Sequence, residues 1–148
     1  MLAVYHLSAY DCEHLIKKVQ AFIEDNMAKI LVVDDDKGAT DLLEAILLAT
    51  GHQAVVINDS SKAMETAAQE KPNLILLDLM MPEPTGFQLC RMLRQNPDFR
   101  TVPIVIITAL DNTDSRVVAI GAGANGFLRK PFHVSDLTDK IKDLLPEK

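Results

Sequence analysis

The sequence lacks the features that mark several large classes of protein. No apolar run approaches the ~20 residues of a bilayer-spanning helix, and the amino terminus has none of the segments of a secretory signal. Cysteine is scarce, because Cys12 and Cys90 are the only two and lie far apart. They form neither a metal-ligand pair nor a disulfide framework. The sequence therefore predicts a cytoplasmic protein with two reduced thiols and no membrane segment.

An excess of basic residues is also missing. Lys and Arg number 15 against 21 Asp and Glu, and the formal net charge is −6. Nucleic-acid backbones are bound by basic patches, so this chain alone is not expected to bind nucleic acid. Its 148 residues are 48% hydrophobic, which is typical of one ordered globular domain with a single core.

The most informative stretch of the chain covers residues 73–82. Four apolar residues, 74–77, run without interruption into Asp78, and Pro82 then prevents a direct continuation as strand or helix. An unbroken apolar run of this kind indicates a strand that is buried on both faces of a parallel sheet. Asp78 is thus expected at the carboxyl end of a buried strand, where α/β proteins bind ligands.

Hydrophobic periodicity along the chain predicts an alternation of strands and helices. The predicted strands are 29–33, 54–57, 73–77, 103–107 and 125–128, and helices are expected near 42–48, 61–70, 86–95, 113–120 and 134–145. Five strands that alternate with helices indicate an α/β fold, with a doubly wound, five-stranded parallel sheet covered by helices on both faces.

Residues 1–26 form an extension that does not obviously belong to this pattern. Apolar residues recur at helical spacing from Leu15 to Ile23, and Ser8 or Asp11 can cap the start of a helix. Met27 resembles a natural initiator and opens the predicted domain, residues 27–148. Two interpretations stay open: a helix that packs on the domain or pairs with another chain, and an upstream segment without a role in the fold.

Polar residues follow four of the five predicted strands. They are Asp34 with Asp35, Asp78, Thr108 and Lys130. The carboxyl ends of parallel strands share one edge, so these side chains are expected to converge. Three carboxylates at one place repel one another unless a cation compensates them. Mg²⁺ suits oxygen ligands, and Lys130 can supply an ammonium. This chemistry suggests phosphoryl transfer to the Asp78 carboxylate.

Four segments carry a family resemblance. They are residues 30–35, 76–82, 106–109 and 127–132. In combination they resemble the receiver domain of two-component response regulators over residues 27–148. The resemblance implies the flavodoxin-like strand order 2-1-3-4-5, which is known for a chemotaxis member of this family. It also implies that Asp78 accepts a phosphoryl group from a histidine kinase or phosphotransfer protein.

The resemblance further implies a role for each residue of the site. Asp34, Asp35 and Asp78 would hold Mg²⁺ together with the backbone carbonyl of Met80. Thr108 and Lys130 would bind phosphoryl oxygens, the Lys130–Pro131 bond would be cis, and Phe127 stands at the position of a switch aromatic. The signal would leave through the face formed by the fourth helix, the fifth strand and the last helix, toward a second copy, a kinase or a separate effector.

The sequence departs from the family pattern in the loop that opens the third helix. Many relatives have an acid before the helix glycine, whereas this chain has Thr85. The loop is expected to lie away from the nucleophile, so activity should survive. Asp36 adds a third acid, expected to be exposed or to cap a helix. The chain ends with the last predicted helix, so no output domain is expected in it.

Three other classes of protein are alternatives to a receiver. A Mg²⁺-dependent phosphohydrolase needs an acid two residues after its nucleophile, where this chain has Met80. A flavodoxin-type flavin carrier needs a phosphate loop, which residues 34–36 would repel. An interaction module that is never phosphorylated stays open. A receiver is not an enzyme in the ordinary sense, although it catalyses its own phosphorylation and slow dephosphorylation.

Overall fold

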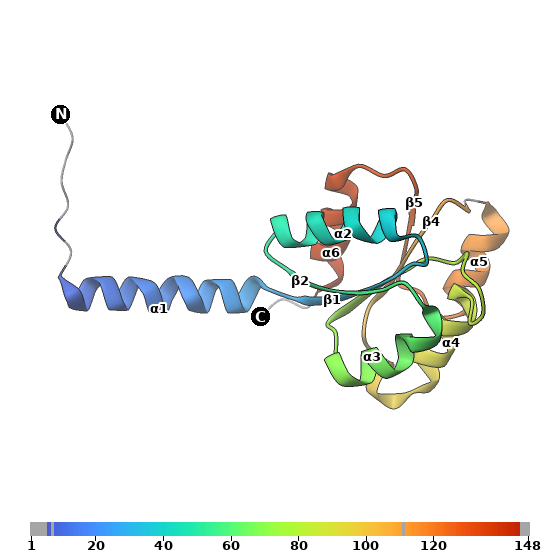
Figure 1. Cartoon of the computed structure of the whole chain (residues 1–148), viewed down its shortest axis with the longest axis horizontal. Coiled ribbons are helices and arrows are strands. Elements are labelled where there is room, and N and C mark those ends of the chain that lie inside the picture. The colour runs from blue at the N-terminus through green and yellow to red at the C-terminus, as the bar shows by residue number, and fades with distance from the viewer. Residues whose placement is uncertain (1–5, 7, 111, 146–148) are drawn as a thin grey trace.

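The fold is built on one five-stranded parallel sheet. The computed structural model describes residues 6, 8–110 and 112–145. The strands are β1 (Lys29–Val33), β2 (Gln53–Ile57), β3 (Leu74–Leu77), β4 (Ile104–Thr108) and β5 (Gly126–Arg129). They lie in the order β2-β1-β3-β4-β5, and every neighbouring pair is parallel. The predicted doubly wound α/β fold and its strand order are confirmed (Figure 1).

Helices cover both faces of the sheet. They are α2 (Lys37–Ala49), α3 (Ala63–Glu70), α4 (Gly86–Gln95), α5 (Thr113–Gly121) and α6 (Val134–Leu144), with short 3₁₀ turns η1 (Ser60–Lys62) and η2 (Pro97–Phe99). One buried cluster joins the sheet to α2 and α6, and a second joins it to α3, α4 and α5. Figure 1 shows α2 and α6 on one side of the sheet and α3 and α4 on the other.

The apolar strands explain why both faces are covered. Successive side chains of a strand point to opposite faces, so Leu31 belongs to one cluster and Ile30 to the other. All four residues of β3 are buried, as expected for the central strand. The unbroken hydrophobic run before Asp78 therefore supplies both halves of the core.

Turn and capping residues set the ends of the elements close to their predicted positions. Asp36 caps α2, because its side chain accepts hydrogen bonds from the backbone N–H groups of Gly38 and Ala39. Asp36 was expected either to be exposed or to cap a helix, and the second expectation is confirmed. Gly51 follows α2 with a φ of 88°, a conformation that glycine adopts easily. β5 begins one residue later than predicted, at Gly126, and the Asn125 side chain before it accepts a hydrogen bond from the Ile104 N–H.

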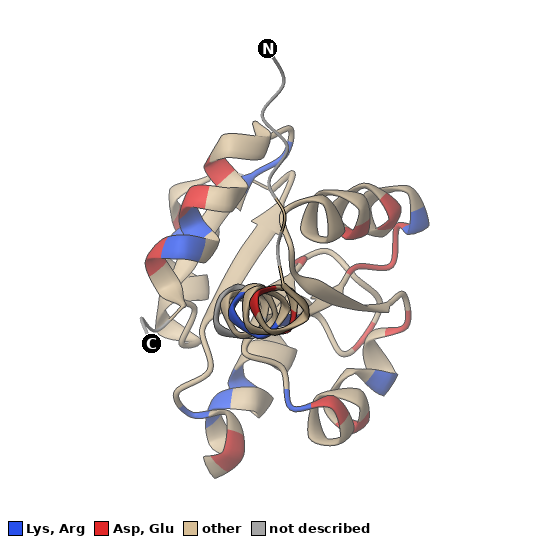
Figure 2. Cartoon of the chain, turned by 90° about the vertical axis from the view of Figure 1, so that its left-hand side faces the viewer, with Lys and Arg blue, Asp and Glu red and all other residues tan. Residues whose placement is uncertain are grey.

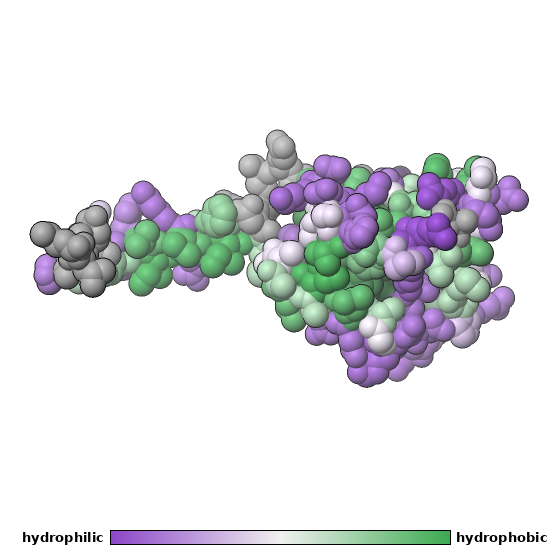
Figure 3. Space-filling model, turned by 90° about the horizontal axis from the view of Figure 1, so that it is seen from above, coloured by the Kyte–Doolittle hydropathy of each residue, from purple (hydrophilic) through white to green (hydrophobic). Residues whose placement is uncertain are grey.

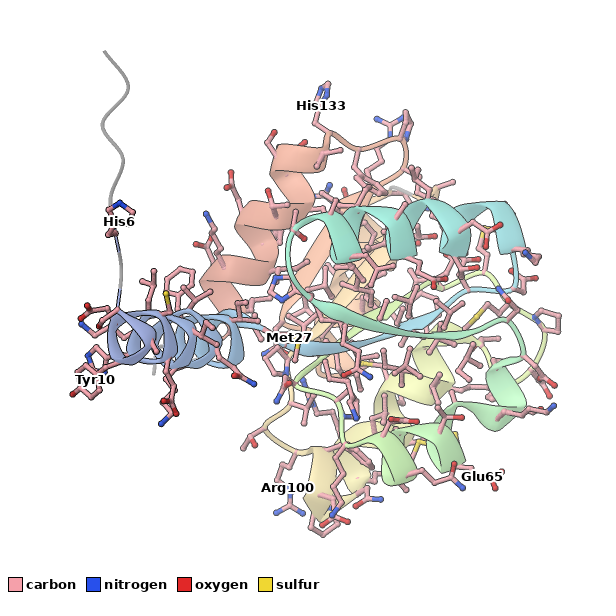
Figure 4. All side chains as sticks on the ribbon, turned by 60° about the vertical axis from the view of Figure 1, so that its left-hand side comes forward. His6, Tyr10, Met27, Glu65, Arg100 and His133 are labelled. Carbon is pink, nitrogen blue, oxygen red and sulfur yellow. The ribbon has the colours of Figure 1, made fainter. Side chains whose placement is uncertain are left out.

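A helix precedes the sheet. α1 (Ala9–Asn26) begins with a capping box formed by Ser8 and Asp11 and runs into β1 through Met27, which lies at their junction (Figure 4). α1 projects from the rest of the chain (Figures 1 and 2). Residues 1–5 and 7 of the predicted extension lie outside the described residues. Within the described chain, no helix combines the length and the apolar composition that crossing a membrane requires.

Candidate functional site

Three carboxylates meet at the carboxyl edge of the sheet. Asp34 follows β1 and is 2% exposed, Asp78 follows β3 and is 8% exposed, and Asp35 is exposed. Each offers an oxygen that lies within 4.8 Å of the other two. Parallel pairing of β1 with β3 explains this convergence, because residue Val33 is in register with Leu77 and the acids follow directly. The edge thus concentrates negative charge in a mostly buried place.

The ammonium of Lys130 lies between the two buried carboxylates. Its Nζ is 2.6 Å from Asp34 Oδ2 and 3.6 Å from Asp78 Oδ2. The Lys130 backbone N–H donates to the Thr108 carbonyl at 2.9 Å, which fixes the end of β5 beside the end of β4. The Lys130–Pro131 bond is cis, as predicted, and so is Glu83–Pro84. Lys130 is therefore bound more closely to Asp34 than to Asp78.

Burial and charge act together on the protonation of Asp78. Removal of the carboxylate from water raises the pKa of Asp78, and the nearby Asp34 charge raises it further. Lys130, the Thr108 hydroxyl and the Met80 N–H oppose this change without cancelling it. For Lys130, burial lowers the pKa, but the hydrogen bond that its ammonium donates to Asp34 and the charges of both aspartates outweigh burial and raise the pKa overall. The ammonium stays charged, and the site holds an excess of carboxylate.

Thr108 and Met80 flank the Asp78 carboxylate. Thr108 is fully buried at the end of β4, and its Oγ1 accepts a hydrogen bond from the Leu110 N–H at 3.2 Å. The Met80 N–H is 3.4 Å from Asp78 Oδ1, and the Met80 side chain is 60% exposed. The side chains of Met80 and Leu110 are a thioether and a hydrocarbon, so neither brings a hydroxyl, an amide or an acid to the site.

Phe127 lies on β5, away from the carboxylates. It is in register with Ile106 of β4, packs against the cluster under α3, α4 and α5, and is half-buried. The guanidinium carbon of Arg116, on α5, lies 5.0 Å from the centre of the Phe127 ring. Such a contact is a cation–π interaction. Phe127 thus joins the sheet to α5.

Two supporting residues were missed from the sequence. The Asn58 side chain donates to the Asp34 carbonyl and to the Thr40 hydroxyl, both at 2.9 Å, and so ties the acidic loop to α2. The signal that could have found Asn58 is its position directly after β2, which places it at the same edge of the sheet. Ser60 similarly donates its hydroxyl to the Pro82 carbonyl at 3.0 Å.

The expectation that the loop at Thr85 lies away from the nucleophile stays a prediction, but Gly86, the first residue of α4, approaches the backbone of Asp78. The Gly86 N–H donates to the Leu79 carbonyl at 3.1 Å. A side chain at Gly86 would collide with the backbone carbonyl of Asp78, which only glycine avoids. The start of α4 therefore lies against the backbone that carries Asp78. Thr85 itself caps α4 in a capping box with Gln88.

The donor set fits a small, hard cation. The ligands of an octahedral Mg²⁺ site lie about 3 Å apart when adjacent and about 4 Å apart when opposite, given metal–oxygen distances of ~2.1 Å. Carboxylate oxygens within 4.8 Å of one another need only a small closure to reach this spacing. Asp34 Oδ2 is occupied by Lys130, and Asp34 Oδ1 accepts the Asp36 N–H at 3.0 Å. Asp35, the exposed carboxylate, is thus the most accessible of the three ligands, and Asp78 is held less closely by Lys130 than Asp34 is.

Fold and site together define a class: a doubly wound α/β protein with an acidic site and one lysine at the carboxyl edge. A sequence model of the response regulator receiver domain matches residues 30–142. The chain belongs to this family, and the resemblance noted in the sequence is confirmed.

Curated relatives are longer than this chain. Response regulator MprA of Mycobacterium leprae is 38% identical over 117 residues, which are 79% of this chain and 50% of MprA. Response regulator PleD of Caulobacter vibrioides is 41% identical over 117 residues, 79% of this chain and 26% of PleD. The chain thus spans half or less of the length of these relatives.

Solved structures of receivers share the fold. Chemotaxis protein CheY4 of Vibrio cholerae superposes with a TM-score of 0.77 at 27% identity, over 80% of this chain and 99% of CheY4. The BeF3-activated receiver domain of Klebsiella pneumoniae RstA gives 0.72 at 32% identity, over 78% and 97%. The Mn²⁺-bound form of response regulator Rcp1 gives 0.66 at 30% identity, over 78% and 90%.

Proposed function

We propose that residues 27–148 form a cytoplasmic phosphoacceptor receiver, in which Asp78 takes a phosphoryl group from a histidine kinase or a phosphotransfer protein. The observation that carries this proposal is the position of Asp78. It is a carboxylate at the end of the central strand, 3.6 Å from an ammonium and within 4.8 Å of two further acids. Membership of the receiver family supports the same role.

Phosphoryl transfer to Asp78 breaks the bond between phosphorus and the leaving oxygen of the donor. An Asp78 oxygen forms the new bond to phosphorus, and the leaving group departs with the electron pair of the broken bond. Negative charge on the three phosphoryl oxygens then needs positive partners. Lys130 can approach these oxygens by exchanging its hydrogen bond to Asp34, and the Thr108 hydroxyl can donate to a second oxygen.

Mg²⁺ is the proposed cofactor. Asp35 and Asp78 would hold it directly, Asp34 directly or through water, and the Met80 carbonyl would add a further oxygen. When bound, it would offset carboxylate repulsion and bind the oxygens of the transferring group. The Mn²⁺-bound form of the related Rcp1 supports a divalent cation at such a domain.

The signal is proposed to leave through the face made by α5, β5 and α6. A phosphoryl group on Asp78 would draw Thr108 toward it, because it adds charge and hydrogen-bond acceptors. That movement opens space behind β4, and Phe127 can turn into it because Ala109 is small. The Arg116–Phe127 contact would then break. We expect a shift between two populations rather than a complete switch, since Phe has no hydroxyl to lock either state.

A hydrolase is less well supported than a receiver. The position two residues after Asp78 is Met80, whose side chain is exposed and carries no acid. A phosphohydrolase would need a general acid there. The protein is thus proposed to keep its phosphoryl group rather than to turn over a substrate.

The test is the intact mass of the protein after incubation with Mg²⁺ and acetyl phosphate. The parent chain should gain one phosphoryl group, and Asp78→Asn should gain none. Asp36→Asn is the matched control, because it makes the same change at an acid that only caps α2. A phosphoryl gain on Asp78→Asn, or none on the parent with donor and Mg²⁺, would contradict the proposal.

A further inference from the structure

An exposed apolar stripe runs along α1. It consists of Leu15, Ile16, Val19, Phe22 and Ile23, each between 50 and 68% exposed. At 100° per residue these positions cover an arc of about 120° on one side of the helix. Figure 3 shows apolar atoms in a row along the projecting helix. The stripe has the width of a core-facing helix surface, but it lies in solvent.

The opposite side of α1 has its own polar contacts. Lys17 and Glu13 form an ion pair at 3.3 Å, and the rings of Tyr10 and His14 stack with their centres 6.0 Å apart. Every described side chain from residue 8 to residue 23 is exposed. The receiver body therefore does not cover the apolar side of this helix.

Packing of its apolar side would stabilise this helix. α1 has 18 residues, and most of the stability of a helix in a protein comes from the packing of an amphipathic face rather than from intrinsic helix propensity. Val19 and the two isoleucines lower its intrinsic preference for helix. Burial of the stripe would stabilise the helix, which points to a partner surface.

The spacing of the stripe fits a second copy of the same helix. Cys12, Leu15, Val19 and Phe22 follow one another at intervals of three and four, the pattern of a two-stranded seam. In a parallel coiled coil, a β-branched residue at the first apolar heptad position, as Val19 would be, and leucine at the second, as Leu15 would be, favour two strands over three or four. In such a pair Lys18 of one copy faces Ile23 of the other, so like charges do not meet.

The area of the stripe is sufficient for a modest dimer. Five large side chains at these exposures present on the order of 500 Å² of apolar surface per helix. Two facing copies would remove on the order of 1,000 Å² from water, which is the lower limit for a specific interface. Each copy contributes the same surface, as twofold symmetry requires.

We propose that α1 pairs in parallel with α1 of a second copy and makes the protein a dimer before any phosphorylation. α1 joins the sheet at the amino end of β1, whereas Asp34 follows its carboxyl end. The five residues of β1 separate the two by about 16 Å. The pairing surface is therefore independent of the phosphorylation site and of the proposed function.

Sedimentation equilibrium of the full chain tests the pairing. At high micromolar concentration the parent should sediment with about twice its 16.3 kDa mass, with or without acetyl phosphate. Val19→Lys places a charge in the seam and should raise the dissociation constant at least tenfold. Ala21→Lys is the matched control, because it lies about 200° from Val19 around the helix and should leave the dimer intact.

Circular dichroism of Val19→Lys and Ala21→Lys shows whether each variant is still folded, so that loss of the dimer can be distinguished from unfolding. If Val19→Lys keeps the sheet signal and becomes a monomer while Ala21→Lys stays a dimer, the seam is supported. A monomeric parent, a dimer that forms only after phosphorylation, or equal behaviour of the two variants would overturn the proposal. Asp78→Asn should dimerise like the parent, so the failure of one proposal does not imply failure of the other.

Cross-linking tests the parallel arrangement. Cys12 is exposed and belongs to the seam, whereas Cys90 is buried. A short bis-maleimide should join two copies through Cys12 in a parallel pair and should fail after Cys12→Ser. In an antiparallel pair the two Cys12 side chains lie near opposite ends. A dimer that Cys12 does not cross-link would overturn the parallel arrangement.

Discussion

The carboxyl edge of the sheet and the amino-terminal helix depart from the usual distribution of residues in opposite ways. The edge buries two carboxylates beside a half-buried lysine, whereas the stripe of α1 exposes five large apolar side chains. Proteins normally place charge in water and apolar surface in the core. Each departure costs free energy in the isolated chain, and a binding partner would remove each cost. At the edge the proposed partners are a divalent cation and a phosphoryl group, and along α1 the proposed partner is the same helix of a second copy.

The largest effect is expected from removal of the ammonium at the edge. Lys130→Met leaves Asp34 and Asp78 without a positive neighbour and should lower the free energy of unfolding by about 2–3 kcal/mol at neutral pH without metal. Phosphoryl transfer from acetyl phosphate should fall by about 100-fold or more. Chemical denaturation and intact mass measure the two effects.

The matched control is Lys29→Met. Lys29 pairs with Glu70 at 3.0 Å, but this pair is more exposed. Its loss should cost no more than about 1 kcal/mol and leave phosphorylation unchanged. Similar losses of stability in both variants would mean that the edge is no more strained than an ordinary surface pair.

Metal binding should depend most on the exposed acid of the edge. Asp35→Asn removes an accessible ligand and should weaken Mg²⁺ binding about tenfold or more, while stability without metal stays equal or rises because repulsion falls. The chain has no tryptophan, so NMR titration is the suitable measurement. Asp36→Asn should bind Mg²⁺ as the parent does. An unchanged titration of Asp35→Asn would remove Asp35 from the metal site.

The lifetime of the phosphorylated form should be long because the approach to Asp78 is apolar. By resemblance to other receivers, Met80 and Leu110 are expected to flank the path of the attacking water, and neither side chain orients a water strongly. Met80→Asn combined with Leu110→Glu should speed the loss of phosphate by roughly tenfold. Intact mass against time measures the rate. Equal or slower loss in the double variant would contradict this account.

Neutralising the nucleophile should stabilise the metal-free protein. Burial and Asp34 raise the pKa of Asp78 above its usual 3.8, so its ionised form costs stability above the folded-state pKa. That cost disappears as the pH falls through the folded pKa toward 3.8. Asp78→Asn should therefore unfold at a higher urea concentration than the parent at pH 7, and the difference should almost vanish near pH 4. Urea unfolding in the presence of EDTA tests this, and a gain that is independent of pH would contradict it.

The smallest effect on the receiver is expected from removal of α1. A chain that begins at Met27 loses the apolar stripe but none of the sheet. Its free energy of unfolding at low protein concentration should stay within about 0.5 kcal/mol of the parent, and it should still take up phosphoryl groups. Loss of phosphorylation, or a large loss of stability in the monomer, would show that residues 27–148 are not the complete receiver unit.

The comparison also shows which predictions the sequence could support. Strand positions were recovered to within about one residue, because residues 74–77 and 104–107 are apolar without interruption. In a layered α/β fold, an unbroken apolar run of this length fits a parallel strand that helices cover on both faces. The convergence of Asp34, Asp78 and Lys130 followed from parallel topology alone. The Gly86 contact could not be predicted, because it depends on the path of a loop that has no periodicity.

The sequence by itself determined the class of fold, the edge that gathers the charged residues and the helical spacing of the amino-terminal stripe. These depend on local periodicity and on the rule that parallel strands end at one edge. Only the tertiary structure decided that Lys130 lies 2.6 Å from Asp34 and 3.6 Å from Asp78, and that the receiver body leaves the stripe of α1 uncovered. Such distances depend on strand register and on the direction in which one helix leaves a strand. Neighbouring residues in the sequence do not encode either of these.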